Sequence, residues 1–419
     1  MTPGQAIRTA LALALGAAIS LGLSRFSYAL LLPPMRADLG WSYFTAGAMN
    51  TLNAAGYLIG ALLMPAWLRW RGARAAQQAL VGGSLAAAAV LALHGLTTSD
   101  ALLAAWRLLA GVASAAVFVS GGLLAARLSA APGVEGRVSS GLVLGLYYGG
   151  VGLGIVACAL ALPPLLEPAT SASAGAVVRV PSGPFAGLGL AAWQEGWMVL
   201  GVLALLATVP MARRMRTVDL PAPPAPTGGK PRLALGSLGA GLAGYACFGL
   251  GYIGYMTFIV TLLREQGMAP ATVAAFYALL GVGVMASPWL WAGLLQRARG
   301  GGALATLNAL LGLATALPVF LAHPVAAFVS GALFGAVFLS VVASTTAMVR
   351  HNLDSAHWPA GISAFTIVFA AGQIVGPSLV GGLADGAGGL RMGLAVSAAL
   401  LALGAGIAWA QRPLAHSRS

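Results

Sequence analysis

Long apolar stretches and short polar breaks alternate along the whole chain. The apolar runs end at charged residues, proline or glycine, and each is long enough to cross a bilayer as a helix. We place them at residues 8–34, 43–67, 75–95, 100–126, 138–163, 194–212, 235–263, 270–295, 303–322, 324–349, 359–384 and 390–410. Only His323-Pro324 separates the ninth run from the tenth, so a count of eleven stays open. The pattern predicts an all-α integral membrane protein with twelve transmembrane helices.

Composition supports this class and excludes others. The 419 residues are 59% hydrophobic and 7% charged, whereas soluble domains are about a quarter charged. The length leaves no room for a large soluble domain. The first run contains Arg25 and lacks a small-residue cleavage site, so we interpret it as a retained helix and not as a signal peptide.

The basic residues predict the orientation. With the N-terminus inside, the inner segments hold sixteen Lys and Arg and the outer loops hold four. Both termini are therefore expected in the cytoplasm. The net charge of +13 comes from arginines beside membrane spans, so we do not expect a nucleic-acid partner.

The chain divides in the middle. A Pro-rich segment flanked by basic residues, 213–234, separates six runs from six, which predicts bundles at 1–212 and 235–419 joined by a cytoplasmic linker. The polar, low-complexity stretch at about 164–193 is expected to be a flexible outer loop.

The two halves are related in sequence. A shift of about 227 residues aligns Gly22 with Gly249 and also, far away, Gly154 with Gly381. One shift that holds in several spans indicates an internal repeat. Two parallel six-helix repeats are typical of transporters whose site lies between the halves and opens to alternate sides.

Several motifs resemble those of the major facilitator superfamily. PAWLRWRGAR after the second run is similar to the family's loop motif GxLxDRxGRR, and GLLQRARGGG repeats it after the eighth. Arg69 and Arg297 stand where that motif has an acid, and we count both as candidate gating residues. GQIVGPSLVGG in the eleventh run is similar to the antiporter motif GxxxGPxxGG, and SRFSYALLLPPMRADLGWS resembles the YbfB/YjiJ-type bacterial branch. The resemblance implies a monomeric secondary transporter whose spans 1, 4, 7 and 10 line a central cavity.

Two arginines lie inside predicted spans. Arg25 and Arg107 are at similar depths, and a midspan arginine costs about 2.5–3.5 kcal/mol to insert, so each needs a cavity or a partner. All nine carboxylates lie in loops or at span ends. The implied cavity would bring both arginines to one chamber, where an anionic substrate supplies the counter-charge. For Arg107, a structural role remains an equal alternative.

Other polar side chains can extend the wall of such a cavity, although interhelical hydrogen bonding is an alternative role for them. The candidate substrate-binding residues are Arg25, Arg107, Tyr28, Asn50, Asn53, Tyr57, Tyr252, Tyr255, Thr345 and Gln373.

The outer ends of spans 1 and 7 are candidates for a gate. The repeat sets Arg36 and Asp38 against Arg264 and Glu265, so crossed pairs of Arg36 with Glu265 and of Asp38 with Arg264 can form when the halves close outside. Such exposed pairs are worth about 0–1 kcal/mol each, which is enough to tilt two nearly equal states.

The sequence offers no enzyme or cofactor motif in a suitable structural context. GLGYIG at Gly249 matches GxGxxG but lies in an apolar span with no preceding strand. The chain has no HExxH, GxSxG or P-loop motif. We therefore expect no catalytic residues, no metal and no cofactor.

The leading hypothesis is a secondary active transporter in a bacterial inner membrane. It moves a small organic anion, with a carboxylate favoured, by alternating access, as symporter or antiporter. The alternative is a drug or metabolite exporter with an apolar cavity, in which Arg25 and Arg107 are structural.

Overall fold

The structure is a computed structural model of the 419-residue chain. It describes residues 1–414 except 73, 132, 133, 135, 167, 168, 174, 175, 181–183, 221–234, 355 and 356. Most of the predicted linker, 221–234, therefore lies outside the described residues.

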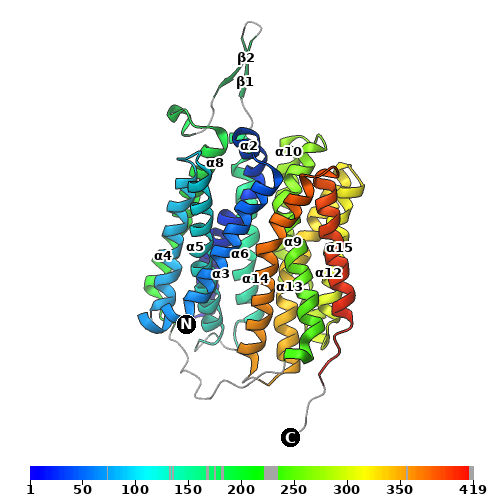
Figure 1. Ribbon diagram of the computed structural model, residues 1–419. Coiled ribbons are helices and arrows are strands. Elements are labelled where there is room, and N and C mark those ends of the chain that lie inside the picture. The colour runs from blue at the N-terminus through cyan, green and yellow to red at the C-terminus, as the bar shows by residue number, and fades with distance from the viewer. Residues whose placement is uncertain are drawn as a thin grey trace. The chain divides into compact units, whose positions relative to one another are not determined.

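Helices dominate the described chain (Figure 1). Twelve spans, four of them built from more than one helical segment, are long and apolar enough to cross a membrane, which confirms the predicted count. In chain order the elements are α1 (Pro3–Ala17), the π-helix η1 (Ala18–Phe26), α2 (Tyr28–Leu39), α3 (Tyr43–Arg71), α4 (Ala75–His94), α5 (Asp100–Ser129), α6 (Ser140–Ala161), α7 (Pro163–Leu166), β1 (Ala169–Ser173), β2 (Ala176–Val180), η2 (Ala186–Leu188), α8 (Ala192–Thr217), η3 (Leu235–Leu238), α9 (Gly239–Glu265), α10 (Pro270–Leu290), α11 (Ala292–Arg297), α12 (Gly302–Phe320), α13 (Pro324–Asn352), α14 (Trp358–Ala384) and α15 (Gly389–Trp409).

The ninth and tenth runs are separate helices. α12 ends at Phe320 and α13 begins at Pro324, so the count of eleven is wrong. Pro324 occupies the first helical position, where its missing N–H costs nothing, and the His323 ring accepts a hydrogen bond from Val325 N at 3.2 Å. These local signals restart the helix within three residues.

The first span is longer than predicted and changes its winding. It runs from Pro3 to Leu39 and continues through Pro33-Pro34, where we had ended it. Proline is tolerated in membrane helices because neighbouring groups satisfy the freed carbonyls. In the middle, residues 18–26 form a π-helix, in which Ser27 N bonds to Gly22 O five residues back. Such segments are rare and are often found at functional sites.

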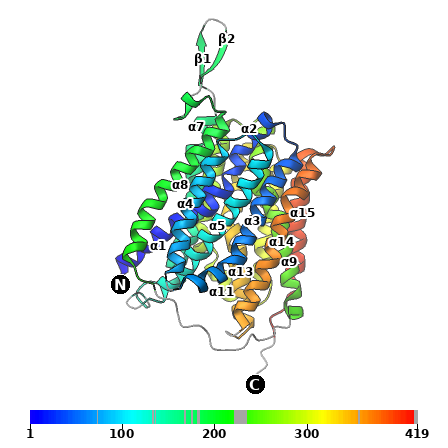
Figure 2. The same cartoon turned by 60° about the vertical axis from the view of Figure 1, so that its left-hand side comes forward.

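A small hairpin interrupts the stretch that we expected to be a flexible loop. β1 and β2 pair antiparallel, with Ala169 opposite Val180 and Ser173 opposite Ala176. The hairpin projects beyond the ends of the neighbouring helices in both ribbon views (Figures 1 and 2). Nothing in the alternation of this polar segment marked it as a strand pair.

The described chain forms two compact units. Unit 1 comprises 1–42, 52–221 and 260–281, and unit 2 comprises 43–51, 222–259 and 282–419. The predicted bundles at 1–212 and 235–419 stay a prediction.

Close glycine contacts hold equivalent helices together inside each unit. In unit 1 a Cβ on Gly22 would lie 2.5 Å from the Gly154 Cα, so η1 and α6 touch through their backbones. In unit 2 a Cβ on Gly372 would lie 2.9 Å from the backbone of Gly249, so α14 and α9 touch in the same way. Spans 1 and 5 thus pack as spans 7 and 11 do, which agrees with the sequence repeat.

The start of α3 belongs to unit 2. The Asp385 carboxylate accepts hydrogen bonds from the backbone N–H groups of Tyr43 at 2.8 Å and Phe44 at 2.9 Å, and so caps the helix N-terminus. Thr51 Oγ1 donates to Ile374 O at 2.7 Å. The first turns of α3 are therefore fixed to α14.

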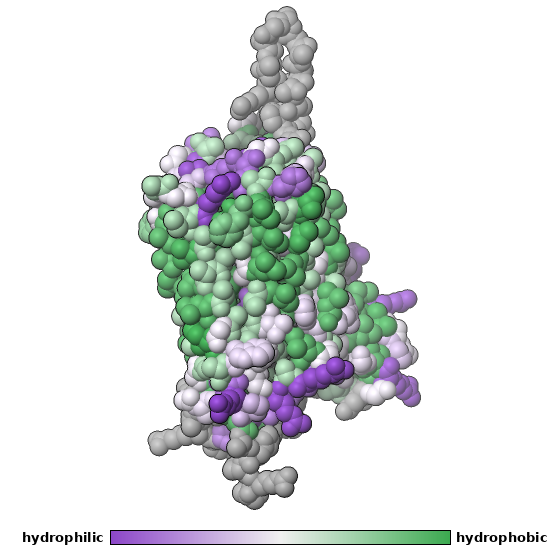
Figure 3. All heavy atoms as spheres, turned by 90° about the vertical axis from the view of Figure 1, so that its right-hand side faces the viewer, coloured by the Kyte–Doolittle hydropathy of each residue, from purple (hydrophilic) through white to green (hydrophobic). Residues whose placement is uncertain are grey.

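The surface matches a membrane environment. On the face shown in Figure 3, apolar residues form a broad band between two polar ends. Large apolar side chains such as Leu62, Leu160 and Phe320 are exposed, as expected where lipid instead of water is the solvent.

Candidate functional site

Arg25 is a buried charged residue of unit 1 with unsatisfied hydrogen-bond donors among the described residues. It lies near the end of η1 and is 4% exposed. Its Nε and Nη2 atoms are buried and have no hydrogen-bond partner in the described chain. The Tyr57 ring of α3 lies 5.8 Å from the guanidinium carbon, which gives Arg25 a cation–π contact. This contact offsets only part of the cost of burying the charge.

Arg107 lies close enough for its charge to interact with that of Arg25, but its surroundings differ. Arg107 lies in α5 and is 1% exposed. Its guanidinium carbon is 4.4 Å from the centroid of the Tyr28 ring. Nη1 donates to Ser24 O at 3.4 Å, and the Trp197 ring is 5.9 Å away. Arg107 is therefore held on several sides by the protein itself.

Serines tie η1 to α5 beside these arginines. Ser20 Oγ donates to Ser114 O at 2.7 Å, and Ser114 Oγ is 2.9 Å from Ser20 O and 3.0 Å from Ser24 Oγ. All three serines are fully buried. The π-helix that carries Arg25 is thus fixed to the helix that carries Arg107.

The two candidate asparagines of α3 lie in different units. Asn53 Nδ2 donates to Arg107 O at 3.1 Å, while its Oδ1 is buried without a partner in the described residues. Asn50 lies in unit 2, where Nδ2 donates to Thr257 Oγ1 at 2.7 Å. Of the candidates in the first half, Arg25, Arg107, Tyr28, Asn53 and Tyr57 therefore gather in unit 1.

The candidates from the second half lie in unit 2. Tyr252 Oη donates to Gln373 Oε1 at 2.8 Å, and the Tyr255 and Ser330 hydroxyls are 2.7 Å apart. Thr345 Oγ1 donates to Val342 O within its own helix, at 2.9 Å. Tyr252 and Gln373 come together, whereas Tyr255 and Thr345 have other partners.

An aromatic ladder, which we define as Tyr245, Phe248, Tyr252, Phe338 and Phe369, surrounds Tyr252. The Phe248 and Phe369 rings are 5.3 Å apart and nearly parallel at 7°, and Tyr252 stacks on Phe338 at 5.8 Å and 12°. Tyr245 stacks on Phe248 and Phe369. The ladder joins α9, α13 and α14, and sequence analysis missed it because these helices are distant in the chain.

The gating candidates have partners that the sequence did not predict. Asp38 Oδ2 accepts from Trp193 Nε1 at 2.7 Å, and Arg264 Nη1 donates to Met268 O at 2.7 Å. Each of these two groups thus has another hydrogen-bond partner among the described residues. The gate formed by Arg36, Asp38, Arg264 and Glu265 stays a prediction.

The Asp38 contacts lead to a separable test. Asp38→Asn keeps an oxygen that can accept from Trp193 but removes the negative charge. If Asp38 acts through a charge pair with Arg264, transport by this variant should fall several-fold in a vesicle uptake assay. Trp193→Phe is the matched variant that removes the indole donor alone. Full transport by Asp38→Asn together with loss in Trp193→Phe would contradict the charge pair.

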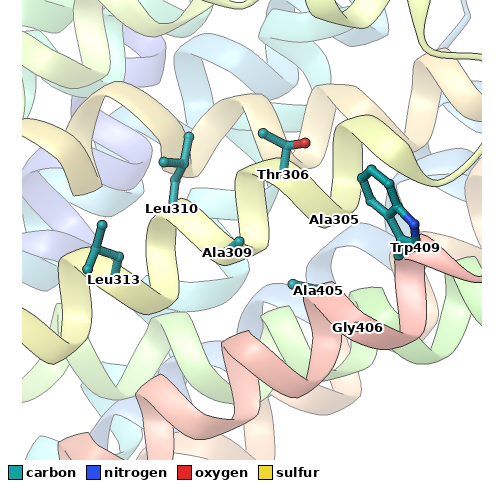
Figure 4. A pocket seen from close by; sticks show the side chains of 8 residues that line it. All are labelled: Ala305, Thr306, Ala309, Leu310, Leu313, Ala405, Gly406 and Trp409. Carbon is teal, nitrogen blue, oxygen red and sulfur yellow. The ribbon is translucent and has the colours of Figure 1, made fainter.

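The groove shown in Figure 4 is lined by none of these residues. It has a volume of about 510 Å³ between α12 and α15, and Thr306 is the one side chain with a polar oxygen among those that line it. None of the candidate residues borders it. Its apolar, open character is that of a helix surface facing lipid.

Among the described residues, no cluster of three or more His, Cys, Asp or Glu side chains can hold a metal ion. Cys158 and Cys247 are free and buried. The candidate site is therefore built from guanidinium, hydroxyl, amide and aromatic groups.

The twelve-helix fold and the match to a family of MFS-type transporters identify the class of protein as a membrane transporter of the major facilitator superfamily. Residues 17–409 match the family described as uncharacterised MFS-type transporter YbfB, and the chain belongs to that family. The resemblance in the N-terminal segment is thereby confirmed. Family and fold are those of transporters and not of enzymes.

Similar proteins share the length and the fold. The chain is 28% identical over 408 residues to a chloramphenicol resistance protein of Streptomyces lividans, covering 92% of this chain and 93% of that protein. A bacterial homologue of the human lysosomal transporter Spinster, solved in an inward-facing, unoccupied conformation, superimposes with a TM-score of 0.68 at 15% identity, over 98% and 97% of the two chains. The human organic anion transporter MFSD10 (TETRAN) gives 0.61 at 13% identity, over 97% and 100%. These structural likenesses establish the fold.

Proposed function

We propose that this protein is a secondary transporter that moves a small organic carboxylate across a bacterial inner membrane by alternating access. The observation that carries the proposal is the buried, unpartnered Nε and Nη2 pair of Arg25.

The two free atoms form one edge of the guanidinium. Nε–H and one Nη2–H point the same way along that edge, and together they match the two oxygens of a carboxylate. In the described chain this side-on pair is both buried and unpartnered, and its two parallel donors match a planar carboxylate better than a spherical anion such as chloride. A buried charge without a partner is costly, so a substrate that supplies the opposite charge gains most of that energy on binding.

Arg107 has a supporting role in this proposal. Its guanidinium stacks on Tyr28 and donates to Ser24 O, so the protein already occupies part of its hydrogen-bonding capacity. Its positive charge beside Arg25 still favours an anion at that place. We therefore infer that Arg25 binds the carboxylate and that Arg107 adds to the local field, which suits a substrate with one carboxylate.

Coupling follows from the placement of acids. The Asp38 carboxylate accepts from an indole N–H and the Asp385 carboxylate from backbone N–H groups, in both cases near helix ends. No acid in the sequence lies in the middle of a span to carry a proton. We infer exchange, uniport, or symport in which the proton travels on the substrate.

Orientation and assembly are part of the proposal. Sixteen basic residues on the inner side against four on the outer side support a cytoplasmic location of both termini. The transporter is proposed to act as a monomer, with the lipid bilayer and one small anionic substrate as its partners.

Uptake by proteoliposomes tests the function. Purified protein in phospholipid vesicles should accumulate or exchange at least one member of a panel of labelled monocarboxylates, because the Arg25 edge selects that group. The matching amides and alcohols, which have the same size without the charge, are the control substrates. Equal transport of the acids and their amides would contradict the carboxylate proposal.

A second candidate, export of an apolar aromatic compound, is favoured by the aromatic ladder in unit 2. The five rings stack on one another, and the half-buried Phe369 ring gives a planar molecule an aromatic side chain to pack against. The Streptomyces lividans chloramphenicol resistance protein, 28% identical, supports the same alternative. Under this proposal Arg25→Ala leaves transport intact, whereas Phe369→Ala lowers it. The carboxylate proposal expects loss in Arg25→Ala whatever Phe369→Ala does.

A further inference from the structure

The C-terminal end of α3 carries an exposed cluster of basic and aromatic side chains. We define this α3 cluster as Trp67, Arg69, Trp70, Arg71 and Arg74. The three arginines are exposed, and Trp70 is 74% exposed. Among the described residues from 62 to 74, Met64 is the one buried side chain. This end of the helix therefore stands free of the rest of the fold.

The arginines of the α3 cluster are available to a partner. The Arg71 guanidinium carbon lies 4.8 Å from the ring centroids of both Trp67 and Trp70, so two indoles hold it in place without using its N–H donors. In the described part of the chain, Arg69, Arg71 and Arg74 form no side-chain hydrogen bond or ion pair. The sequence from 39 to 99 contains no acid. This stretch of the chain thus supplies no counter-charge to the arginines.

The second copy of the motif is different. Around Arg297 and Arg299, Asn352 Nδ2 donates to Arg299 O, the His351 ring nitrogen lies 3.0 Å from Ala298 O, and Gly301 N donates to Gln411 O at 2.8 Å. These bonds tie the second loop to its own helices. The open arrangement at the α3 cluster is therefore not a property that both loops share.

We propose that the α3 cluster binds the phosphate headgroup of an anionic phospholipid in the leaflet where α3 ends. Tryptophan prefers the membrane–water interface, and an arginine fork matches phosphate oxygens. Leu62 and Leu63, exposed at 64% and 59% on the preceding turns, give the acyl chains an apolar surface. Along α3 the exposed leucines come first and the arginines follow, as the acyl chains and the headgroup of a lipid do. This order favours a lipid over an acidic protein segment, which would contact the arginines without needing the exposed leucines. This site is independent of the proposed transport substrate.

Tryptophan fluorescence with brominated lipids tests the proposal. The full-length protein is reconstituted in phosphatidylcholine vesicles that contain equal fractions of brominated phosphatidylglycerol or brominated phosphatidylcholine. The difference between wild type and W67F/W70F isolates the signal of the cluster. We expect the charged lipid to be preferred roughly fivefold or more, and R69Q/R71Q/R74Q to remove the preference. R297Q/R299Q is the matched control and should keep it.

Each other outcome overturns the proposal. Equal quenching by both lipids in the wild-type protein would show that the cluster does not select charge. A preference that survives in R69Q/R71Q/R74Q would assign it to other residues. Loss of the preference on adding inorganic phosphate at constant ionic strength would assign the cluster to a soluble phosphate, and loss with a polyglutamate peptide would assign it to an acidic protein segment.

Discussion

Arg25→Ala is expected to abolish carboxylate binding while the protein still folds. Two charge-assisted hydrogen bonds at about 1.5–3 kcal/mol each correspond to a loss of roughly 10²-fold or more in affinity. Folding should be preserved because the variant removes a buried charge whose Nε and Nη2 have no partner in the described chain. Calorimetric titration of the purified protein with a transported carboxylate measures the effect directly.

Two further variants separate charge from geometry. Arg25→Lys restores the charge but not the side-on pair of donors, so affinity should recover only in part. Arg107→Ala removes the stacking on Tyr28 and the bond to Ser24 O, so it should lower thermal stability as well as affinity. Unchanged affinity in Arg25→Ala would refute the anion site.

The helices could be predicted because the bilayer imposes one simple requirement on the sequence. Every span needs about 20 apolar residues with internally satisfied backbone groups, and each apolar run became such a helix. The predicted helix ends were wrong where a local sequence signal competed with this requirement. Pro33-Pro34 resembles a helix end, yet α2 continues to Leu39.

The site could be predicted only in part. Arg25 and Arg107 each lie inside an apolar run, and this predicts that both are buried charges that need partners. Their actual neighbours depend on which helices touch. Trp197 of α8 and Ser24 of η1 contact Arg107, and no periodicity in the sequence indicates these pairings. The sequence also did not indicate the π-helix between residues 18 and 26, nor that the Tyr28 ring covers Arg107.

Helix contact at the site depends on two glycines. A Cβ on Gly56 would lie 2.0 Å from Leu108 O, and one on Gly111 would lie 2.1 Å from Asn53 O. These are backbone atoms that cannot rotate away, so α3 and α5 approach this closely only because both positions lack a side chain. The same contact places Asn53 against Arg107 O.

Gly56→Ala should therefore push α3 and α5 apart. We expect a loss of about 1–3 kcal/mol in stability, typical of overpacking, and a marked loss of carboxylate transport because Asn53 and Tyr57 move away from the arginines. Gly82→Ala is the matched control, since Gly82 lies in α4 with open space around its Cβ position. Its helix should be unchanged or more stable by up to about 1 kcal/mol, because alanine is the better helix former. Thermal unfolding in detergent, followed by vesicle uptake, measures both effects. If Gly56→Ala were as stable and as active as Gly82→Ala, α3 and α5 could not be in the contact that builds the Arg25 site.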